Sequence, residues 1–205
     1  MHLFITTKNH LPLAEREIYS LFGDVVRDDN HENVFLTKKK VDEKLVRRLA
    51  YTSSVYKVRI EANSLRAVVS DIKKYDWEKV VDKTFCVRSH LGLGQAESSK
   101  NLLGEKEIAE LVWDKLKYPT VNLSNPRTLI GLFNFRGKYL VCTRVWENEK
   151  DFFERKPHLR KENHPTSLDP RLALACVNIT GIKKGTLLDP FCGTGGFLIE
   201  AGLLN

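Results

Sequence analysis

Hydrophobic and polar positions alternate in short blocks over roughly the first sixty residues. Two stretches, 12–21 and 42–50, carry apolar residues at helical spacing; the first has a proline near its start, and Asp42 is expected to cap the second. Strand-like runs lie at 3–6, 25–26, 34–36 and 55–60. The predicted order is therefore strand, helix, strand, strand, helix, strand.

This order is the ferredoxin-like pattern, and it predicts an α+β unit over residues 1–62. A second block, 63–146, begins with a helix at 65–75 and includes a clear amphipathic helix at 105–117. Its strand-like runs are 84–89, 120–123, 128–135 and 138–146. The second block is therefore also predicted to mix helices and strands.

Residues 147–163 interrupt the pattern, because they are highly charged and have no clean period. Such a segment is typical of an interdomain connector. Asp169 and Pro170 then have the cap and first-position residue types of a helix. The elements expected beyond the connector are a helix at 172–179, a strand at 186–188, a loop at 189–196 and a helix at 197–204. Residues 164–205 are therefore predicted to begin a further, incomplete domain.

The composition is that of a globular protein with a basic charge balance. Lysine and arginine outnumber aspartate and glutamate by 33 to 26, which suits a polyanionic partner. No apolar run approaches the roughly 18–20 residues of a membrane span, and the N-terminus lacks the features of a signal peptide. The four cysteines form no CxxC pair, so we expect reduced thiols in a cytoplasmic protein and no metal site.

The most specific segment is Asp189-Pro190-Phe191-Cys192-Gly193-Thr194-Gly195-Gly196, which lies between an apolar strand and an apolar helix. Glycine lets a ligand approach the backbone, and the carboxyl end of a strand in an α/β sheet is where such ligands bind. A P-loop would need a lysine where Phe197 stands, and a dinucleotide fingerprint would need GxGxxG rather than GxGG. A structural glycine turn is the remaining alternative to a cofactor site.

This segment strongly resembles the first motif of methyltransferases that act on exocyclic amines of nucleobases. The resemblance implies the start of an α/β Rossmann-like class I methyltransferase domain that binds S-adenosylmethionine through these eight residues, 189–196. Upstream, 153–157 and 164–173 resemble archaeal tRNA guanine-N2 methyltransferases of the guanine 10 type. In that family the stretch before the motif packs over the cofactor. The implied cofactor neighbours are Thr166, Ser167 and Leu168, although an ordinary loop and helix cap would explain the same residues.

The second block resembles a THUMP domain, a module of tRNA-modifying enzymes that docks the acceptor end of tRNA. The resemblance rests on Phe-Cys-Val-Arg at 85–88, the helix at 105–117 and Val-Asn-Leu-Ser-Asn-Pro at 121–126. It implies tRNA as the partner. Arginine can donate two hydrogen bonds to one phosphate. The candidate phosphate contacts are Arg88, Lys100, Arg127 and Arg136, with a solvated surface charge as the alternative for each.

A motif expected downstream in related enzymes, Asp or Asn followed by Pro-Pro and an aromatic residue, does not occur in the sequence, so no catalytic residue is assigned. One strand with two helices cannot fill a doubly wound sheet, so we expect residues 164–205 to need more of a longer chain or a second polypeptide. The predicted function is the tRNA-binding and partial cofactor-binding N-terminal portion of a tRNA guanine-N2 methyltransferase, inactive alone. The alternatives are a stand-alone RNA-binding module, a subunit of a split enzyme, and a methyltransferase for another guanine or RNA.

Overall fold

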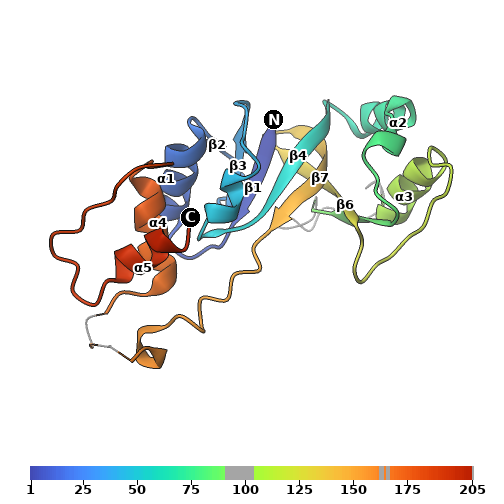
Figure 1. The fold of residues 1–205 in the computed structure, drawn as a ribbon. Helices are drawn as coiled ribbons and strands as arrows, with labels where there is room; N and C mark the ends of the chain where they lie inside the picture. The colour runs from blue at the N-terminus through green and yellow to red at the C-terminus, as the bar shows by residue number, and fades with distance from the viewer. Residues whose placement is uncertain (91–103, 162–163, 165–166, 205) are drawn as a thin grey trace. The chain divides into compact units, whose positions relative to one another are not determined.

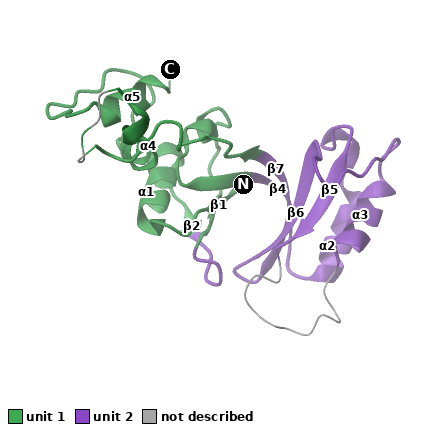
Figure 2. Ribbon diagram, turned by 90° about the horizontal axis from the view of Figure 1, so that it is seen from below, with its two compact units in different colours: residues 1–26, 33–55, 146–205 green, residues 27–32, 56–145 purple. Residues whose placement is uncertain are grey.

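The computed structural model describes residues 1–90, 104–161, 164 and 167–204 (Figure 1). The chain divides into two compact units, the first made of residues 1–26, 33–55 and 146–205 and the second of residues 27–32 and 56–145 (Figure 2). Strand β4, Thr52–Ala62, runs from the first unit into the second. Among the described residues, no helix has both the length and the apolar composition needed to cross a membrane.

The first unit combines N-terminal strands with helices from both ends of the chain. Besides β4 and the last two residues of β7 (Lys138–Glu147), the elements lying wholly or partly in it are β1 (His2–Thr6), α1 (Leu11–Phe22), β2 (Val26–Arg27), β3 (Val34–Thr37), the 3₁₀ helices η1 (Leu45–Arg48) and η3 (Pro157–Leu159), α4 (Pro170–Ile179) and α5 (Gly196–Gly202). The strand order is β2-β3-β1-β4, and β1 pairs antiparallel with β3, with Phe4 opposite Phe35. Helix α4 packs against both α1 and α5, as Figure 1 shows.

The second unit is a sheet with two helices on one face (Figure 2). Besides the rest of β4, its elements are α2 (Leu65–Lys74), the 3₁₀ helix η2 (Trp77–Lys79), β5 (Phe85–Ser89), α3 (Glu105–Trp113), β6 (Thr128–Phe135) and β7 (Lys138–Glu147). The strand order is β4-β7-β6-β5, with β5 parallel and β7 antiparallel to β6. Ile72 of α2 and Ile108 of α3 are fully buried in one core with Ile130 and Leu132 of β6. Side chains alternate between the two faces of a strand, so Ile130 and Leu132 lie on the same face of β6, the one covered by the helices.

The helix predicted over 42–50 is wrong, because only the short 3₁₀ helix η1 forms there. Asp42 does accept an amide hydrogen bond in this turn, at 2.9 Å. The amides of Ala50 and Tyr51, however, donate to the carboxylate of Glu17 in α1, at 2.7 and 3.1 Å. These amides are therefore satisfied by a side chain far away in the sequence rather than by helix carbonyls, which local periodicity does not reveal.

The strands predicted at 120–123 and 186–188 also fail to form. Val121 makes an isolated bridge with Phe85, and 186–188 has no strand partner among the described residues, which leaves Leu188 82% exposed. A strand depends on hydrogen bonds to a neighbouring strand, so an apolar run alone does not create one. The other predicted helices and strands are confirmed, with ends shifted by a few residues.

A buried polar cluster joins α1 to α4. The fully buried Glu17 carboxylate also accepts the side-chain amide of Asn178, at 2.7 Å. Asn178 donates in addition to the Arg48 carbonyl at 2.9 Å and accepts from Arg48 Nε at 3.1 Å. Burial raises the pKa of the Glu17 carboxyl, while its hydrogen bonds act in the opposite direction. The helix that precedes the glycine-rich loop is thus fixed to the N-terminal elements by specific hydrogen bonds as well as by apolar packing.

Helix α4 begins as the sequence predicts, with Asp169 as its cap and Pro170 at its first position. The Asp169 carboxylate accepts the amides of Arg171 and Leu172, at 2.9 and 3.3 Å. We expect Asp169→Ala to lower the free energy of unfolding, measured by urea titration, by about 1 kcal/mol, because both amides lose their acceptor. Asp169→Asn keeps an acceptor oxygen, so its free energy of unfolding should fall clearly less than that of Asp169→Ala. An equal loss in the two variants would contradict the capping role.

Candidate functional site

The glycine-rich loop from Asp189 to Gly196 leads directly into α5. Gly193 and Gly195 have φ angles of +52° and +74°, a left-handed backbone that other residues rarely adopt. A Cβ placed on either glycine would meet no atom within 4 Å. The Gly195 amide closes the turn by donating to the Cys192 carbonyl at 2.8 Å. The backbone of this turn is therefore open to a ligand.

Asp189 begins the loop with one carboxylate oxygen engaged and the other not. Its Oδ1 accepts the Phe191 amide at 3.1 Å. Its Oδ2 is buried and has no hydrogen-bond partner among the described residues. A buried acceptor without a donor is unfavourable and uncommon in native structures. Oδ2 is therefore well suited to accept a hydrogen bond from a bound ligand.

The segment before α4 lies against the glycine-rich loop. The hydroxyls of Ser167 and Thr194 are hydrogen-bonded at 2.9 Å, and the Ser167 amide donates to the His164 carbonyl at 2.8 Å. A Cβ placed on Gly196 would lie 3.5 Å from Leu168 Cβ, in ordinary contact. Two stretches nearly thirty residues apart in sequence thus form one site, since Ser167 and Thr194 are separated by 27 positions.

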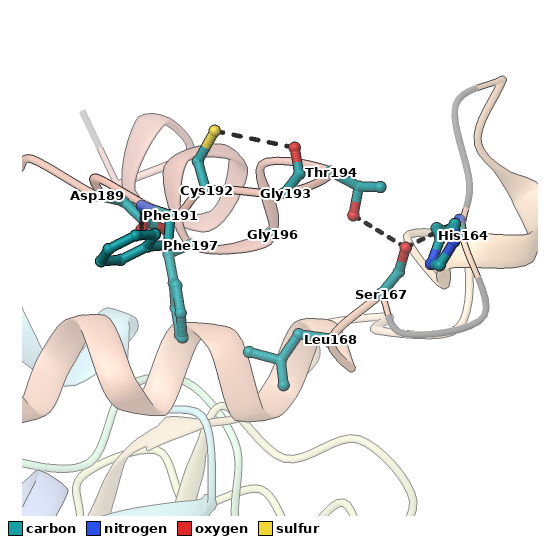
Figure 3. A pocket seen from close by; sticks show the side chains of 10 residues that line it. All are labelled: His164, Ser167, Leu168, Asp189, Phe191, Cys192, Gly193, Thr194, Gly196 and Phe197. Carbon is teal, nitrogen blue, oxygen red and sulfur yellow. Dashed lines mark hydrogen bonds between the residues drawn. The ribbon is translucent and has the colours of Figure 1, made fainter.

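Together these segments line a pocket of about 520 Å³ (Figure 3). This volume lies in the range of small-molecule and cofactor sites. The lining residues are His164, Ser167, Leu168, Asp189, Phe191, Cys192, Gly193, Thr194, Gly196 and Phe197. Pro190 and Gly195 belong to the loop but not to this lining, and Thr166 lies outside the described residues. His164 and Phe197 are lining residues that were not assigned to the site from the sequence.

An ion pair supports the helix that follows the loop. The Arg155 guanidinium donates from Nε and Nη2 to the two carboxylate oxygens of Glu200 in α5, at 3.0 and 3.1 Å. The Glu200 side chain is only 1% exposed. The guanidinium groups of Arg155 and Arg171 also lie over the Phe152 ring, at 5.0 and 4.8 Å from its centre. This pair was not predicted from the sequence, although Glu200 is an acidic residue in an otherwise apolar helix.

The predicted phosphate contacts that the structure describes lie in the second unit. Arg88 and Arg136 each lie beside an acidic side chain, with nitrogen–oxygen distances of 3.4 and 3.0 Å. Arg127 is exposed. Lys100 lies outside the described residues. Binding of phosphate by these residues stays a prediction.

The chemistry of the first pocket fits a cofactor with a small polar end and a cationic centre. The acceptor Asp189 Oδ2, the paired hydroxyls of Ser167 and Thr194 and an open glycine backbone supply polar contacts, and Phe191 and Phe197 supply aromatic rings, which attract cations. Residues 157–205 match the family model described as RMKL-like, methyltransferase domain.

Several relatives of the chain are archaeal tRNA methyltransferases. The chain is 36% identical over 187 residues to the tRNA (guanine(10)-N2)-dimethyltransferase of Methanocaldococcus jannaschii, a match that covers 87% of this chain and 49% of the relative. It is 38% identical over 145 residues to the tRNA (guanine(10)-N2)-dimethyltransferase of Pyrococcus abyssi, a match that covers 70% of this chain and 42% of that relative. The predicted relationship to archaeal tRNA guanine-N2 methyltransferases is therefore confirmed. The chain spans about half the length of these relatives, or less.

A solved structure shares the fold. The crystal structure of TrmN from Thermus thermophilus matches 100% of this chain with a TM-score of 0.60, and the match covers 62% of TrmN. The sequence identity is 19%, so this likeness concerns the fold alone.

Proposed function

We propose that this chain supplies the tRNA-binding part and a portion of the S-adenosylmethionine pocket of a methyltransferase that modifies N2 of guanine 10 in tRNA. The observation that carries the proposal is the pocket in which the open glycine turn, Asp189 and Ser167 converge. The substrate and the position are taken from the names of relatives that are 36% and 38% identical to the chain.

The domain assignment is part of this proposal. Residues 1–62 are a ferredoxin-like unit, an assignment supported by the strand order β2-β3-β1-β4. Residues 63–146 are a THUMP domain, supported by the sheet with two helices on one face. Residues 147–163 are the linker, and residues 164–205 begin the methyltransferase domain, supported by the family match over 157–205.

In the first pocket, the chain's own residues bind and orient the cofactor. When bound, S-adenosylmethionine supplies an electrophilic methyl group on a sulfonium. Asp189 Oδ2 would accept a hydrogen bond from the cofactor, and the Ser167–Thr194 hydroxyl pair holds the segment before α4 against the loop. Phe191 and Phe197 present aromatic rings to the pocket. In the second unit, Arg88, Lys100, Arg127 and Arg136 hold tRNA phosphates.

Two binding measurements test the proposal: retention of labelled S-adenosylmethionine in equilibrium dialysis, and fluorescence anisotropy with a tRNA transcript that carries guanine at position 10. We expect wild-type chain to bind both. Gly195→Val should weaken cofactor binding about tenfold or more, because a β-branched residue at φ +74° strains the turn. Its tRNA affinity should be unchanged.

Gly137→Val is the matched control, because Gly137 also has a positive φ, +79°, but lies in the β6–β7 turn of the second unit. It should leave cofactor binding unaffected. Wild-type chain that binds tRNA but no cofactor would favour the non-catalytic RNA-binding module. Wild-type chain that binds neither would refute the proposal.

A further inference from the structure

A second pocket, of about 480 Å³, lies within the first unit and plays no part in the cofactor site described above. Its lining includes three cationic side chains, those of Lys150, Lys156 and Arg171. The two pockets adjoin along the chain, since Leu168 lines the first and Asp169 lines the second. A ligand in the second pocket is thus held by residues next in sequence to those of the cofactor site.

The cations of this pocket are held by rings and carbonyls rather than by acids. Lys156 Nζ lies 5.1 Å from the centre of the Phe153 ring, and Arg171 packs over Phe152; neither cation forms an ion pair with another described residue. Lys150 Nζ donates to the Leu49 carbonyl at 2.8 Å. Burial lowers the pKa of Lys150 to about 8, so it is still largely protonated at neutral pH. Lys156 and Arg171 therefore present positive charge to an anion, whereas Lys150 also interacts electrostatically with the buried Glu17 carboxyl.

The two acidic residues of the pocket do not neutralise this charge fully. Asp151 Oδ1 accepts the Phe153 amide at 2.7 Å, and Asp169 Oδ1 accepts the Arg171 amide at 2.9 Å. Each carboxylate thus stabilises local backbone, one in a turn and one at the start of α4. The pocket thus has three cationic side chains and two carboxylates, and one oxygen of each carboxylate accepts a backbone amide.

Aromatic rings complete the pocket. Phe153 is 59% exposed, and its ring contacts Lys156 Nζ and, edge-on, the His158 ring, whose centre lies 6.2 Å away. His10 packs edge-on against Tyr51, with ring centres 5.6 Å apart. His10 also has a left-handed backbone, with φ +58°, and strain of this kind in a residue other than glycine is concentrated at functional sites.

We propose that this pocket binds a nucleotide of single-stranded RNA, with the phosphate on Lys156 and Arg171 and the base on the Phe153 ring. Single-stranded RNA sites combine cations for the backbone with aromatic rings on which bases stack. The pocket volume of about 480 Å³ is sufficient for one nucleotide. The inference rests on the proposed function and deepens it: RNA contacts extend beyond the second unit to the segment that borders the cofactor site.

The test is fluorescence anisotropy with the same tRNA transcript, in a potassium chloride series. Phe153→Ala/Lys156→Ala should bind about tenfold more weakly than wild-type chain, because a stacking ring and a phosphate contact are both lost. Lys156→Ala alone should reduce the slope of log K against log salt by about 1. Phe153→Trp/Lys156→Arg should bind like wild-type chain, because it keeps an aromatic ring and a cation.

Leu159→Ala/Lys161→Ala is the matched control, because it removes an exposed apolar side chain and an exposed lysine from the same segment outside the pocket. It should change the affinity less than twofold. Equal tRNA affinity of the pocket and control variants would overturn the pocket assignment and leave the proposed function standing. Absence of tRNA binding by wild-type chain would overturn both.

Discussion

Replacing Glu17 by alanine is expected to lower the free energy of unfolding by about 3–5 kcal/mol. The variant leaves the amides of Ala50 and Tyr51 and the side chain of Asn178 without their acceptor in a site from which water is excluded. Each unsatisfied buried donor is costly, and the deleted side chain leaves a cavity as well. Urea unfolding followed by circular dichroism measures the difference.

Glu154→Ala is the control, since it removes the same charge from an exposed position in the same unit. It should change the free energy of unfolding by no more than about 0.5 kcal/mol. If Glu17→Ala were no more destabilising than Glu154→Ala, the buried cluster would contribute little to stability.

The Glu17 carboxyl also makes stability depend on pH. Burial raises its pKa in the folded protein, so the folded state keeps the proton after the unfolded state has lost it. Its contribution to stability is therefore fully present below the unfolded pKa and falls as the pH rises through the folded one. Glu17→Gln has no titrating group at this position and removes the dependence. The difference in the free energy of unfolding between wild type and Glu17→Gln, measured by urea titration at a series of pH values, should therefore change only between the unfolded-state and folded-state pKa values of Glu17.

Replacing Glu200 by alanine is expected to cost about 2–4 kcal/mol of unfolding free energy, because it leaves the Arg155 guanidinium without its two-point partner. The cost is set below that of a fully buried pair because the Arg155 side chain is 28% exposed. Thermal and urea unfolding should both report it. Glu200 lies in the helix that begins with Gly196 of the loop, so cofactor binding should weaken as well.

Glu149→Ala is a suitable control, because Glu149 is exposed and belongs to the same connecting segment as Arg155. It should leave stability and cofactor binding close to wild type. Cofactor binding that survives in Glu200→Ala, despite the loss of stability, would show that the loop keeps its conformation without the ion pair.

Periodicity predicted most elements of the fold because their stability comes from apolar faces. The amphipathic helix beginning at Glu105 and the strand over Thr128–Phe135 are examples. Periodicity failed where a distant side chain decides the local structure. The predicted helix at 42–50 is interrupted by hydrogen bonds to Glu17, and 186–188 has no neighbouring strand among the described residues.

The glycine-rich turn was predictable because Gly193 and Gly195 have a left-handed backbone that only glycine adopts readily. The approach of Ser167 to Thr194 followed only from the family resemblance, because no local pattern links positions 27 residues apart. The second pocket was not predicted at all. Its residues come from separate segments of the sequence and lie close together only in the folded chain.

The bonds between α1 and α4 have a consequence for how such proteins can be divided or recombined. A chain cut within 147–163 would lose Asn178 together with Leu174 and Ala175, which share an apolar cluster with Ala14 of α1. Helix α1 would keep the buried Glu17 carboxylate without one of its donors. The segment 147–163 therefore separates two parts of the sequence that stabilise each other through contacts between α1 and α4. A recombination event that exchanged residues 164–205 alone would have to preserve the contacts of α4 with α1.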